Sequence, residues 1–335
     1  MSQSAVVIPN LNGKEDIGEC IDSLLKQNAQ IIVVENGSTD NSLEFIKSNF
    51  PEVQLIVNKV NKGFTAVNQG IKKAIDEGYD YVALFNNDAL ADRDWLKHLV
   101  NCLDNNAEVG IATCKFLSYD GDHIDSTGDI YSNWGLSYPR GRGERVSTKY
   151  DNKTDVFGAT GGASIYRISM LKEIGLFDED FFAYFEDVDI SFRAQLAGWK
   201  VKYVPDAIAY HRQGATSKKM KGFTTYNSIK NIPWVWYKNV PNKYLFSVGI
   251  RVNLALVQFI GRAFTRGQGI YAVKGFIRSY MLFPKKQQER RRIQSSKKVS
   301  DDYIWSIIVH DLPPNARALR KIRGVYWKIT GKKDV

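Results

Sequence analysis

The chain has 335 residues, 44% of them hydrophobic, so it is long enough to bury a sizeable core as one large domain with an appendage or as two modest domains. Its three cysteines are odd in number and lack CxxC spacing, so the sequence supports neither a disulfide framework nor a zinc cluster. Residues 1–217 carry a net charge of −10 and residues 218–335 one of +20. An acidic half before a strongly basic half is typical of a catalytic or binding domain followed by a segment that meets an anionic surface.

The first residues lead straight into an apolar run without a basic n-region or a cleavage site. We therefore expect no secretory signal and a reducing, cytoplasmic location.

Apolar runs then alternate with amphipathic stretches, which predicts an α/β fold with a doubly wound, mainly parallel sheet covered on both faces. The expected strands and helices alternate in the order Ala5–Ile8, Ile17–Lys26, Ile31–Glu35, Ser42–Asn49, Val53–Asn58, Thr65–Glu77, Tyr81–Phe85 and Trp95–Asn101.

Polar residues follow four of the expected strands, at Pro9–Asn12, Glu35–Ser38, Asn61–Phe64 and Asn86–Asp88. Ligands of such sheets bind beyond the carboxyl ends of the strands, so these segments are the first candidates for a site.

The pattern loosens between residues 110 and 155 and becomes regular again at Gly158–Tyr166. A helix from Asp187 to Leu196, ended by Gly198, and a strand at Lys200–Val204 are expected to follow.

Beyond His211 the chain is rich in aromatic and basic residues. Its apolar stretch Leu245–Ile260 is shorter than the roughly 20 residues of a spanning helix, so we predict helices that lie on a membrane surface. Lys285–Arg292 would strengthen contact with anionic lipid. A subunit interface, making a homo-oligomer, remains an alternative, and a nucleic-acid surface is a less favoured one.

Transfer of a sugar from a nucleotide donor needs groups that hold the nucleotide, neutralise the departing diphosphate and take a proton from the acceptor hydroxyl. Short polar side chains at strand ends suit the nucleotide, although each also suits a turn or a helix cap: Asn10, Asn12, Glu35, Asn36, Ser38 and Asp40.

Asp88, directly after an apolar strand, suits Mg²⁺ or Mn²⁺ as well as it suits a turn. Glu186, Asp187 and Asp189 lie at an expected helix start, where one carboxylate can act as a base or simply cap the helix. His211 is a possible second metal or phosphate contact, although a lone histidine is more often structural. The absence of GxGxxG and GxxxxGK[ST] motifs argues against dehydrogenase and P-loop chemistry.

In this order, the segments resemble family 2 glycosyltransferases of the GT-A fold, especially their rhamnosyltransferase-like branch, over about residues 4–215. The resemblance implies a nucleotide-binding part at about 1–110, an acceptor-binding part at about 111–217 and a helical C-terminal region at 218–335. The implied nucleotide-binding residues are Pro9, Asn10, Asn12, Glu35, Asn36, Ser38, Asn61, Gly63, Phe64, Asn68, Asn86 and Asn87.

The same resemblance assigns the base to Asp187 with Glu186 and Asp189 in support, and the metal to Asp88 and His211. It further implies a donor and acceptor loop, to which an aromatic side chain contributes, at Gly161, Gly162, Ala163 and Trp199.

The implied activity is an inverting transfer of rhamnose from dTDP-rhamnose to a glycan or lipid-linked glycan at the cytoplasmic face of a membrane, in cell-surface polysaccharide synthesis. Glu35-Asn36 stands where the family often has two aspartates, which leaves a UDP-hexose or UDP-N-acetylhexosamine donor open. A noncatalytic nucleotide-sugar-binding or scaffold protein is the alternative from another class. The sequence does not specify the acceptor, the linkage or the oligomeric state.

Overall fold

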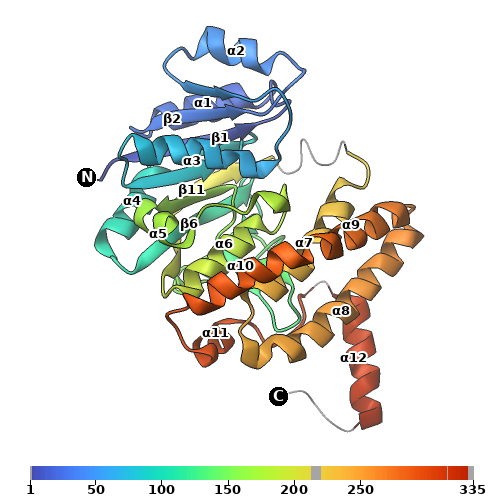
Figure 1. The fold of residues 1–335 in the computed structure, drawn as a ribbon. Helices are drawn as coiled ribbons and strands as arrows, with labels where there is room; N and C mark the ends of the chain where they lie inside the picture. Colours follow the sequence, from blue (N-terminus) through green and yellow to red (C-terminus); the bar gives the residue numbers. More distant parts are fainter. Residues whose placement is uncertain (1, 213–219, 315, 331–335) are drawn as a thin grey trace.

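The computed structural model describes residues 2–212, 220–314 and 316–330, and its strands and helices alternate through the first half of the chain (Figure 1). The elements of this half are β1 (Ser4–Asn10), α1 (Ile17–Leu25), β2 (Gln30–Glu35), α2 (Ser42–Asn49), β3 (Gln54–Val57), η1 (Phe64–Ala66), α3 (Val67–Asp76), β4 (Tyr81–Phe85), β5 (Ala89–Ala91), α4 (Trp95–Asn105), β6 (Val109–Ser118), β7 (Ile124–Ser126), β8 (Asp129–Tyr131) and β9 (Ser137–Pro139).

The second half begins with the last strands of the sheet and continues almost entirely as helices. Its elements are β10 (Ala163–Arg167), α5 (Ile168–Ile174), η2 (Glu179–Phe181), α6 (Glu186–Leu196), β11 (Lys200–His211), α7 (Phe223–Asn239), α8 (Asn242–Thr265), α9 (Gly269–Met281), α10 (Phe283–Ser295), α11 (Asp301–Ile307) and α12 (Arg317–Thr330).

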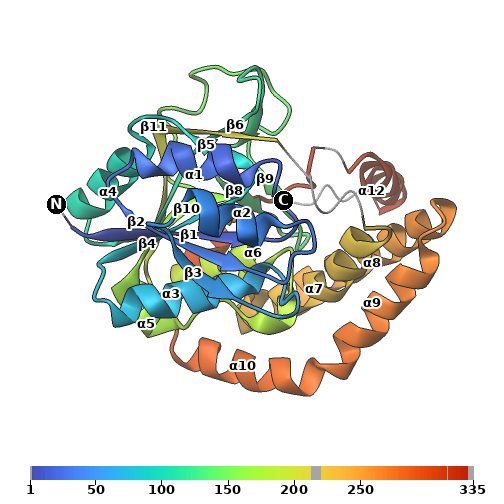
Figure 2. The ribbon, with the colours of Figure 1, turned by 90° about the horizontal axis from the view of Figure 1, so that it is seen from above.

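Within the described residues, one large sheet has the strand order β3-β2-β1-β4-β10-β6-β11-β5, with β7 paired to β6. β1 pairs in parallel with β2 and β4, whereas β10 is antiparallel to β4 and β6. Side chains of α1, α2 and α4 pack on one face of the sheet and those of α3, α5 and α6 on the other. In Figure 2, α1 and α4 lie on one side of the strands and α3 and α5 on the other. The predicted α/β fold with a mixed, mainly parallel sheet is therefore confirmed.

The helices after the sheet are not a detached appendage. Val188 and Phe192 of α6 share one hydrophobic core with Ile229 and Trp234 of α7 and with Val252 of α8. Part of the basic character of this region is also internal. Lys286 and Arg290 are buried, so the expectation that the whole Lys285–Arg292 run faces anionic lipid was wrong.

α8 has 24 residues, which is longer than the apolar stretch expected from the sequence and makes it, by length and composition alone, long and apolar enough to cross a membrane. One side of α8 packs against α7 and α9. Its other side exposes Phe246, Ile250, Leu254, Val257 and Phe264 to solvent.

Candidate active site

A pocket of about 440 Å³ opens beyond the carboxyl ends of β1, β2 and β4. Parallel neighbouring strands end at the same edge of the sheet, so the polar residues that follow them meet there. The sequence-predicted residues that line this pocket are Pro9, Asn10, Asn36, Asn61, Gly63, Phe64, Asn86, Asn87, Asp88, Glu186 and His211.

Hydrogen bonds between the strand ends give this edge of the pocket its shape. Asn10 Nδ2 donates to Glu35 Oε2 at 2.6 Å, and Asn10 Oδ1 accepts from Asn87 Nδ2 at 2.8 Å. The other oxygen of Glu35 accepts from the backbone N–H of Ser38 at 2.8 Å. Glu35 is buried, and neither it nor Ser38 is among the lining residues, so both act by holding the loops in place.

Gly63 lies where the loop between β3 and η1 meets the segment that precedes α6. Its φ is +75°, and a Cβ at this position would lie 2.1 Å from the carbonyl oxygen of Phe182. Asn36 Nδ2 donates to the carbonyl of Gly63 at 2.9 Å, which fixes the loop from the side of β2. The close approach of the two backbones therefore requires glycine.

The lining also lacks Asp187 and the loop residues Gly161, Gly162 and Ala163, whose surroundings are described below, and four further predicted residues lie away from it. Asn12 accepts from the backbone N–H of Thr39 through its side-chain oxygen. Asn68 is buried and bonds both the N–H and the carbonyl of Phe177. Asp189 is buried in contact with cationic side chains. Trp199 precedes β11, whose opposite end is His211, so the strand separates the two by about 35 Å.

His211 and Asp88 form a pair suited to one cation. His211 Nε2 lies 3.2 Å from Asp88 Oδ1, which is about the spacing of two adjacent oxygen or nitrogen ligands around an ion held at ~2.1 Å. His211 Nδ1 lies 2.8 Å from Asp125 Oδ2, so Asp125 orients the ring and directs Nε2 toward Asp88. The donor set therefore fits Mg²⁺ or Mn²⁺.

Without an ion, the charge around the histidine favours the protonated ring, so a cation bound at Nε2 would replace a proton there. Burial would lower the pKa of His211, but the hydrogen bonds and negative charges of Asp125 and Asp88 outweigh it and raise the pKa to about 9. Arg142 lines the pocket and pairs with the other oxygen of Asp125 at 2.8 Å. The carboxylates of Asp88 and Asp125 thus draw positive charge to this end of the pocket.

Three carboxyl groups lie close together, those of Glu186 and Asp187 at the start of α6 and that of Asp129 in β8, and their surroundings differ. Burial and the charge on Asp187 raise the pKa of Glu186 well above its usual value and that of Asp129 to about 8. Burial also raises the pKa of Asp187, but the backbone N–H groups of Gly161, at 3.1 Å, and Val188, at 2.8 Å, oppose this shift. Asp187 is therefore the member of the group whose carboxylate form is best stabilised.

Two glycines allow the turn before β10 to approach these groups closely. A Cβ on Gly161 would lie 2.9 Å from Phe64 Cζ and 3.6 Å from Asp187 Cβ, and one on Gly162 would lie 3.0 Å from Asn86 Nδ2. Ala163 is buried as the first residue of β10. The predicted donor and acceptor loop therefore lies between Asp187 and the pocket floor.

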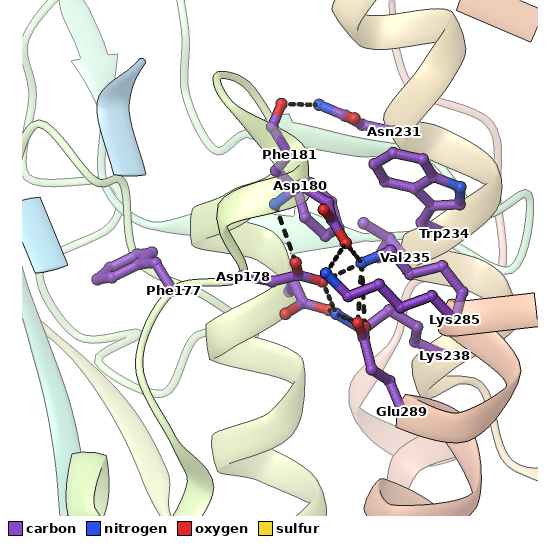
Figure 3. Close-up of polar contacts among 12 residues, drawn as sticks. Phe177, Asp178, Asp180, Phe181, Asn231, Trp234, Val235, Lys238, Lys285 and Glu289 are labelled. Atoms are coloured by element: carbon purple, nitrogen blue, oxygen red, sulfur yellow. Dashed lines mark hydrogen bonds and ion pairs between the residues drawn. The ribbon is translucent and has the colours of Figure 1, made fainter. Parts of the chain in front are cut away.

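The aromatic segment Phe181–Phe185 before α6 has an unusual backbone. Phe182, Tyr184 and Phe185 have φ values of 65°, 68° and 70°, a region that costs non-glycine residues roughly 1 kcal/mol or more each. Asn231 of α7 donates through Nδ2 to the carbonyls of Phe181, Ala183 and Tyr184 at 3.0, 2.9 and 2.8 Å (Figure 3 labels the first pair). The C-terminal helices therefore hold the segment that carries the candidate base.

Beside it, Asp178, Asp180 and Glu289 lie close enough together to share a metal ion (Figure 3). Ammonium groups already lie among them, however. Lys286 Nζ contacts Asp178 at 2.6 Å and Asp180 at 2.7 Å, and Lys238 Nζ contacts Asp178 at 2.5 Å and Glu289 at 3.1 Å. We call these five residues the charge cluster. It joins η2 to α7 and α10 as a network of ion pairs. With Lys285, whose Nζ lies 2.7 Å from Asp180, its three carboxylates face three ammonium groups and need no metal ion to balance their charge.

Sequence reasoning missed Asp125, Asp129, Arg142 and Asn231. The first three belong to the irregular stretch between residues 110 and 155, where no periodic pattern indicates which side chains face inward. Asn231 lies in the C-terminal region, whose helices the sequence suggested only as a membrane or subunit surface. An acidic residue in that stretch was the signal available for Asp125, since a metal-binding histidine usually has a carboxylate partner.

Comparison with known proteins agrees with the fold and the motif order. The family model described as glycosyl transferase family 2 matches residues 5–175. An N-acetylglucosaminyl-diphospho-decaprenol L-rhamnosyltransferase of Mycobacterium tuberculosis is 27% identical over 212 residues, covering 56% of this chain and 68% of the relative.

Among solved structures, GalNAc-T7 with UDP, GalNAc and Mn²⁺ superposes with a TM-score of 0.59 at 17% identity, over 73% of this chain and only 49% of the other. A mannosyltransferase from Pyrobaculum calidifontis, in complex with GDP-Man and Mn²⁺, superposes with a TM-score of 0.52 at 14% identity, over 91% and 86% of the two chains. These two likenesses concern the fold.

Proposed function

The chain belongs to glycosyl transferase family 2, and from this membership and the geometry of its site we propose an inverting transfer in which Asp187 is the base. The chain is thus a glycosyltransferase of glycan or polysaccharide synthesis, not the noncatalytic protein left open by its sequence. In the proposed step the acceptor hydroxyl oxygen attacks the anomeric carbon while the bond from that carbon to the diphosphate oxygen breaks. The hydroxyl proton passes to Asp187, and one displacement inverts the configuration.

The choice of Asp187 over Glu186 rests on their protonation. Glu186 lines the pocket, but one of its oxygens is buried without a hydrogen-bond partner, and its raised pKa favours the neutral acid. A neutral acid donates a proton and does not accept one. Asp187 receives two backbone N–H groups, which favour the anion that a base requires.

Asp88 and His211 would hold Mg²⁺ or Mn²⁺, and such an ion supplies positive charge to the departing diphosphate. Asn86 and Asn87 continue this edge of the pocket toward Asn10, on the side proposed for the nucleotide. Asp125 would keep the imidazole in the orientation that binds the ion.

For the donor we favour dTDP-rhamnose, supported by the similarity to the L-rhamnosyltransferase of Mycobacterium tuberculosis, with a UDP-hexose or UDP-N-acetylhexosamine as the alternative. A thermal-shift panel of nucleoside diphosphates and their sugars with Mn²⁺ or Mg²⁺ separates the two, because a ligand that binds the native state raises its stability. Stronger stabilisation by UDP-sugars would overturn the rhamnosyl assignment.

For the location we propose contact with the inner face of the cytoplasmic membrane. The support is the row Phe246, Ile250, Leu254 and Val257 on α8, whose side chains are 50 to 80% exposed. Flotation with vesicles tests this contact, and substitution of Phe246 and Val257 by serine is expected to abolish it. A dimer that dissociates in the same variant would instead identify the row as a subunit interface.

The base assignment is tested by comparing Asp187→Asn with Glu186→Gln. Removing a general base typically costs 10²- to 10⁴-fold in rate, so Asp187→Asn is expected to fall in that range while still binding nucleotide. Glu186→Gln keeps a neutral, hydrogen-bonding side chain and is expected to lose much less. Full activity of Asp187→Asn, or a product with retained anomeric configuration, would overturn the mechanism.

A further inference from the structure

One charged residue of the active-site pocket has no part in the step described so far. Among the described lining residues, Arg142 is the only lysine or arginine, and it shares the pocket with the carboxyl groups of Asp88 and Glu186 and with His211. The diphosphate of a nucleotide sugar gains a negative charge when its bond to the sugar breaks. A permanent cation in the lining is therefore the kind of group that stabilises this departing charge.

Asp125 holds the guanidinium of Arg142 at two points. Nη2 lies 2.8 Å from Asp125 Oδ1, and Nε donates to the backbone carbonyl of the same residue at 3.1 Å. The side chain of Asp125 is only 2% exposed, whereas that of Arg142 is 54% exposed. The arginine thus reaches a buried anchor with one edge of its fork and keeps the rest of its surface open to the pocket that it lines.

The backbone around Arg142 is held as well as its side chain. Arg140 and Gly143, on either side of it, donate backbone hydrogen bonds at 2.8 Å to the carbonyls of Gly128 and Ile124, respectively. A loop that is tied on both sides of a residue loses little conformational freedom when a ligand binds there. Arg142 is therefore preorganised before any ligand arrives.

Arg142 is linked to both halves of the active site. Its anchor Asp125 also lies 2.8 Å from His211 Nδ1, so one buried carboxylate fixes the arginine and the candidate metal ligand together. Burial raises the pKa of Asp187, and the nearby backbone N–H groups and the charge of Arg142 lower it, so the guanidinium is within electrostatic range of the candidate base. The bond that breaks has the metal pair on one side and the base on the other, and Arg142 is close to both.

A structural role alone, as the counter-ion of Asp125, accounts for less of this geometry. Arg140, two residues earlier, shows how a structural arginine is used in the same loop: its Nε and Nη2 donate to the hydroxyl and carbonyl of Thr127, and its Nη1 donates to the carbonyl of Lys153. The contacts of Arg142 with Asp125 lie on one edge of the fork, and an ion pair that is half exposed adds little to stability.

We propose that Arg142 is a further ligand-binding residue of the reaction, which donates hydrogen bonds to the terminal phosphate of the nucleoside diphosphate and stabilises the charge that this phosphate gains as the sugar leaves. The inference rests on the proposed function, because it concerns the donor of that reaction. A guanidinium carries more N–H donors than the two contacts with Asp125 use. Its charge-assisted bonds to phosphate oxygens are among the strong hydrogen bonds of proteins.

The test measures binding of a nucleoside, its monophosphate and its diphosphate to the full chain by titration calorimetry in Mn²⁺. The probes are uridine, UMP and UDP or thymidine, dTMP and dTDP, whichever base the thermal-shift panel selects. Arg142→Gln removes the charge, and Arg142→Lys keeps the charge without the fork. The matched control is Arg145→Gln, which removes an exposed charge three residues further along and outside the pocket lining.

We expect Arg142→Gln to bind the diphosphate about 10- to 100-fold more weakly than wild type, the loss typical of one hydrogen bond to a charged group. Binding of the nucleoside should be unchanged, and the monophosphate should lose less than the diphosphate. Arg142→Lys should recover part of the affinity, and Arg145→Gln should match wild type. Electron paramagnetic resonance titration without nucleotide should give the same Mn²⁺ dissociation constant for Arg142→Gln and wild type.

Three results would overturn the inference. Equal diphosphate binding by Arg142→Gln and Arg145→Gln would exclude the contact, and an equal loss for the nucleoside would indicate a distorted pocket. A loss of Mn²⁺ affinity as large as the loss for the diphosphate would show that Arg142 acts on the metal pair through Asp125. In each case wild-type binding of the diphosphate leaves the proposed function standing, whereas a wild-type chain that binds no nucleotide refutes the proposed function itself.

Discussion

Replacing Asn231 by alanine tests whether α7 holds the catalytic segment in place. Asn231 is fully buried, and its Nδ2 is the hydrogen-bond donor to the carbonyls of Ala183 and Tyr184; the carbonyl of Phe181 has a second donor in Lys230. The substitution therefore leaves two partly buried carbonyls without this partner. At about 1–3 kcal/mol for each, we expect a loss of roughly 2–4 kcal/mol, allowing for relaxation.

We expect Asn231→Ala to lower the turnover rate as well as the free energy of unfolding, and the effect on turnover to be the more specific of the two. Once released, Tyr184 and Phe185 can leave their positive φ values, which moves the start of α6 and Asp187 with it. A displacement of about 1 Å at a reacting group costs on the order of 100-fold in rate. Release of nucleoside diphosphate from the donor measures turnover, and urea unfolding measures stability.

Asn227→Ala is the matched control, because Asn227 is a buried asparagine one turn earlier on α7. Within the described part of the chain, its Nδ2 bonds only the carbonyl of Phe223 in its own helix. We expect a comparable or smaller loss of stability in this control and near-normal turnover. If Asn231→Ala keeps wild-type turnover, or loses no more than Asn227→Ala, the segment is held by its own packing and the reasoning is refuted.

Three further perturbations have defined outcomes. Asp125→Asn weakens the orientation of His211 and is expected to raise the Mn²⁺ dissociation constant 10- to 100-fold by electron paramagnetic resonance titration; an unchanged value would contradict the role of Asp125. Lysine neighbours outweigh burial and hold the pKa of Asp178 well below its usual value, so its contribution to stability is present above the unfolded pKa of about 3.9 and declines as pH falls below it. Asp178→Asn should therefore lose about 3 kcal/mol at pH 7 and distinctly less at pH 3.5 in denaturant unfolding, and an equal loss at both pH values would argue against this linkage. Gly63→Ala introduces a Cβ against the carbonyl of Phe182 and is expected to destabilise the chain by more than about 1 kcal/mol and to weaken nucleotide binding, whereas a neutral result would mean that the two loops separate freely.

The sheet and one edge of the pocket were predictable because both follow from local patterns. Buried apolar runs such as Tyr81–Phe85 define strands, and parallel strands bring the residues after them together, which places Asn10 and Asp88 in one pocket. α2 begins and ends at the predicted residues, Ser42 and Asn49.

The remaining features depend on contacts between distant segments, which no local pattern reports. Asp125 reaches His211 across 86 positions, and Asn231 reaches Phe181 across 50. Trp199 shows the converse error. Its motif follows the candidate base closely in sequence, but α6 carries the chain to the far end of the sheet, from which β11 returns to the pocket. The basic C-terminal composition also concealed that Lys286 is an interior residue paired with acids.

The charge cluster and Asn231 impose an order on the assembly of the enzyme during its synthesis. The ribosome releases the strands of the nucleotide pocket first, but Asp178 acquires its partner Lys286 only after 108 further residues have been added. Domains tend to fold as their segments emerge, and contacts between distant residues form last. A nascent chain can therefore form the sheet edge that carries Asn10 and Asp88 before α7 and α10 have fixed the segment that leads into Asp187.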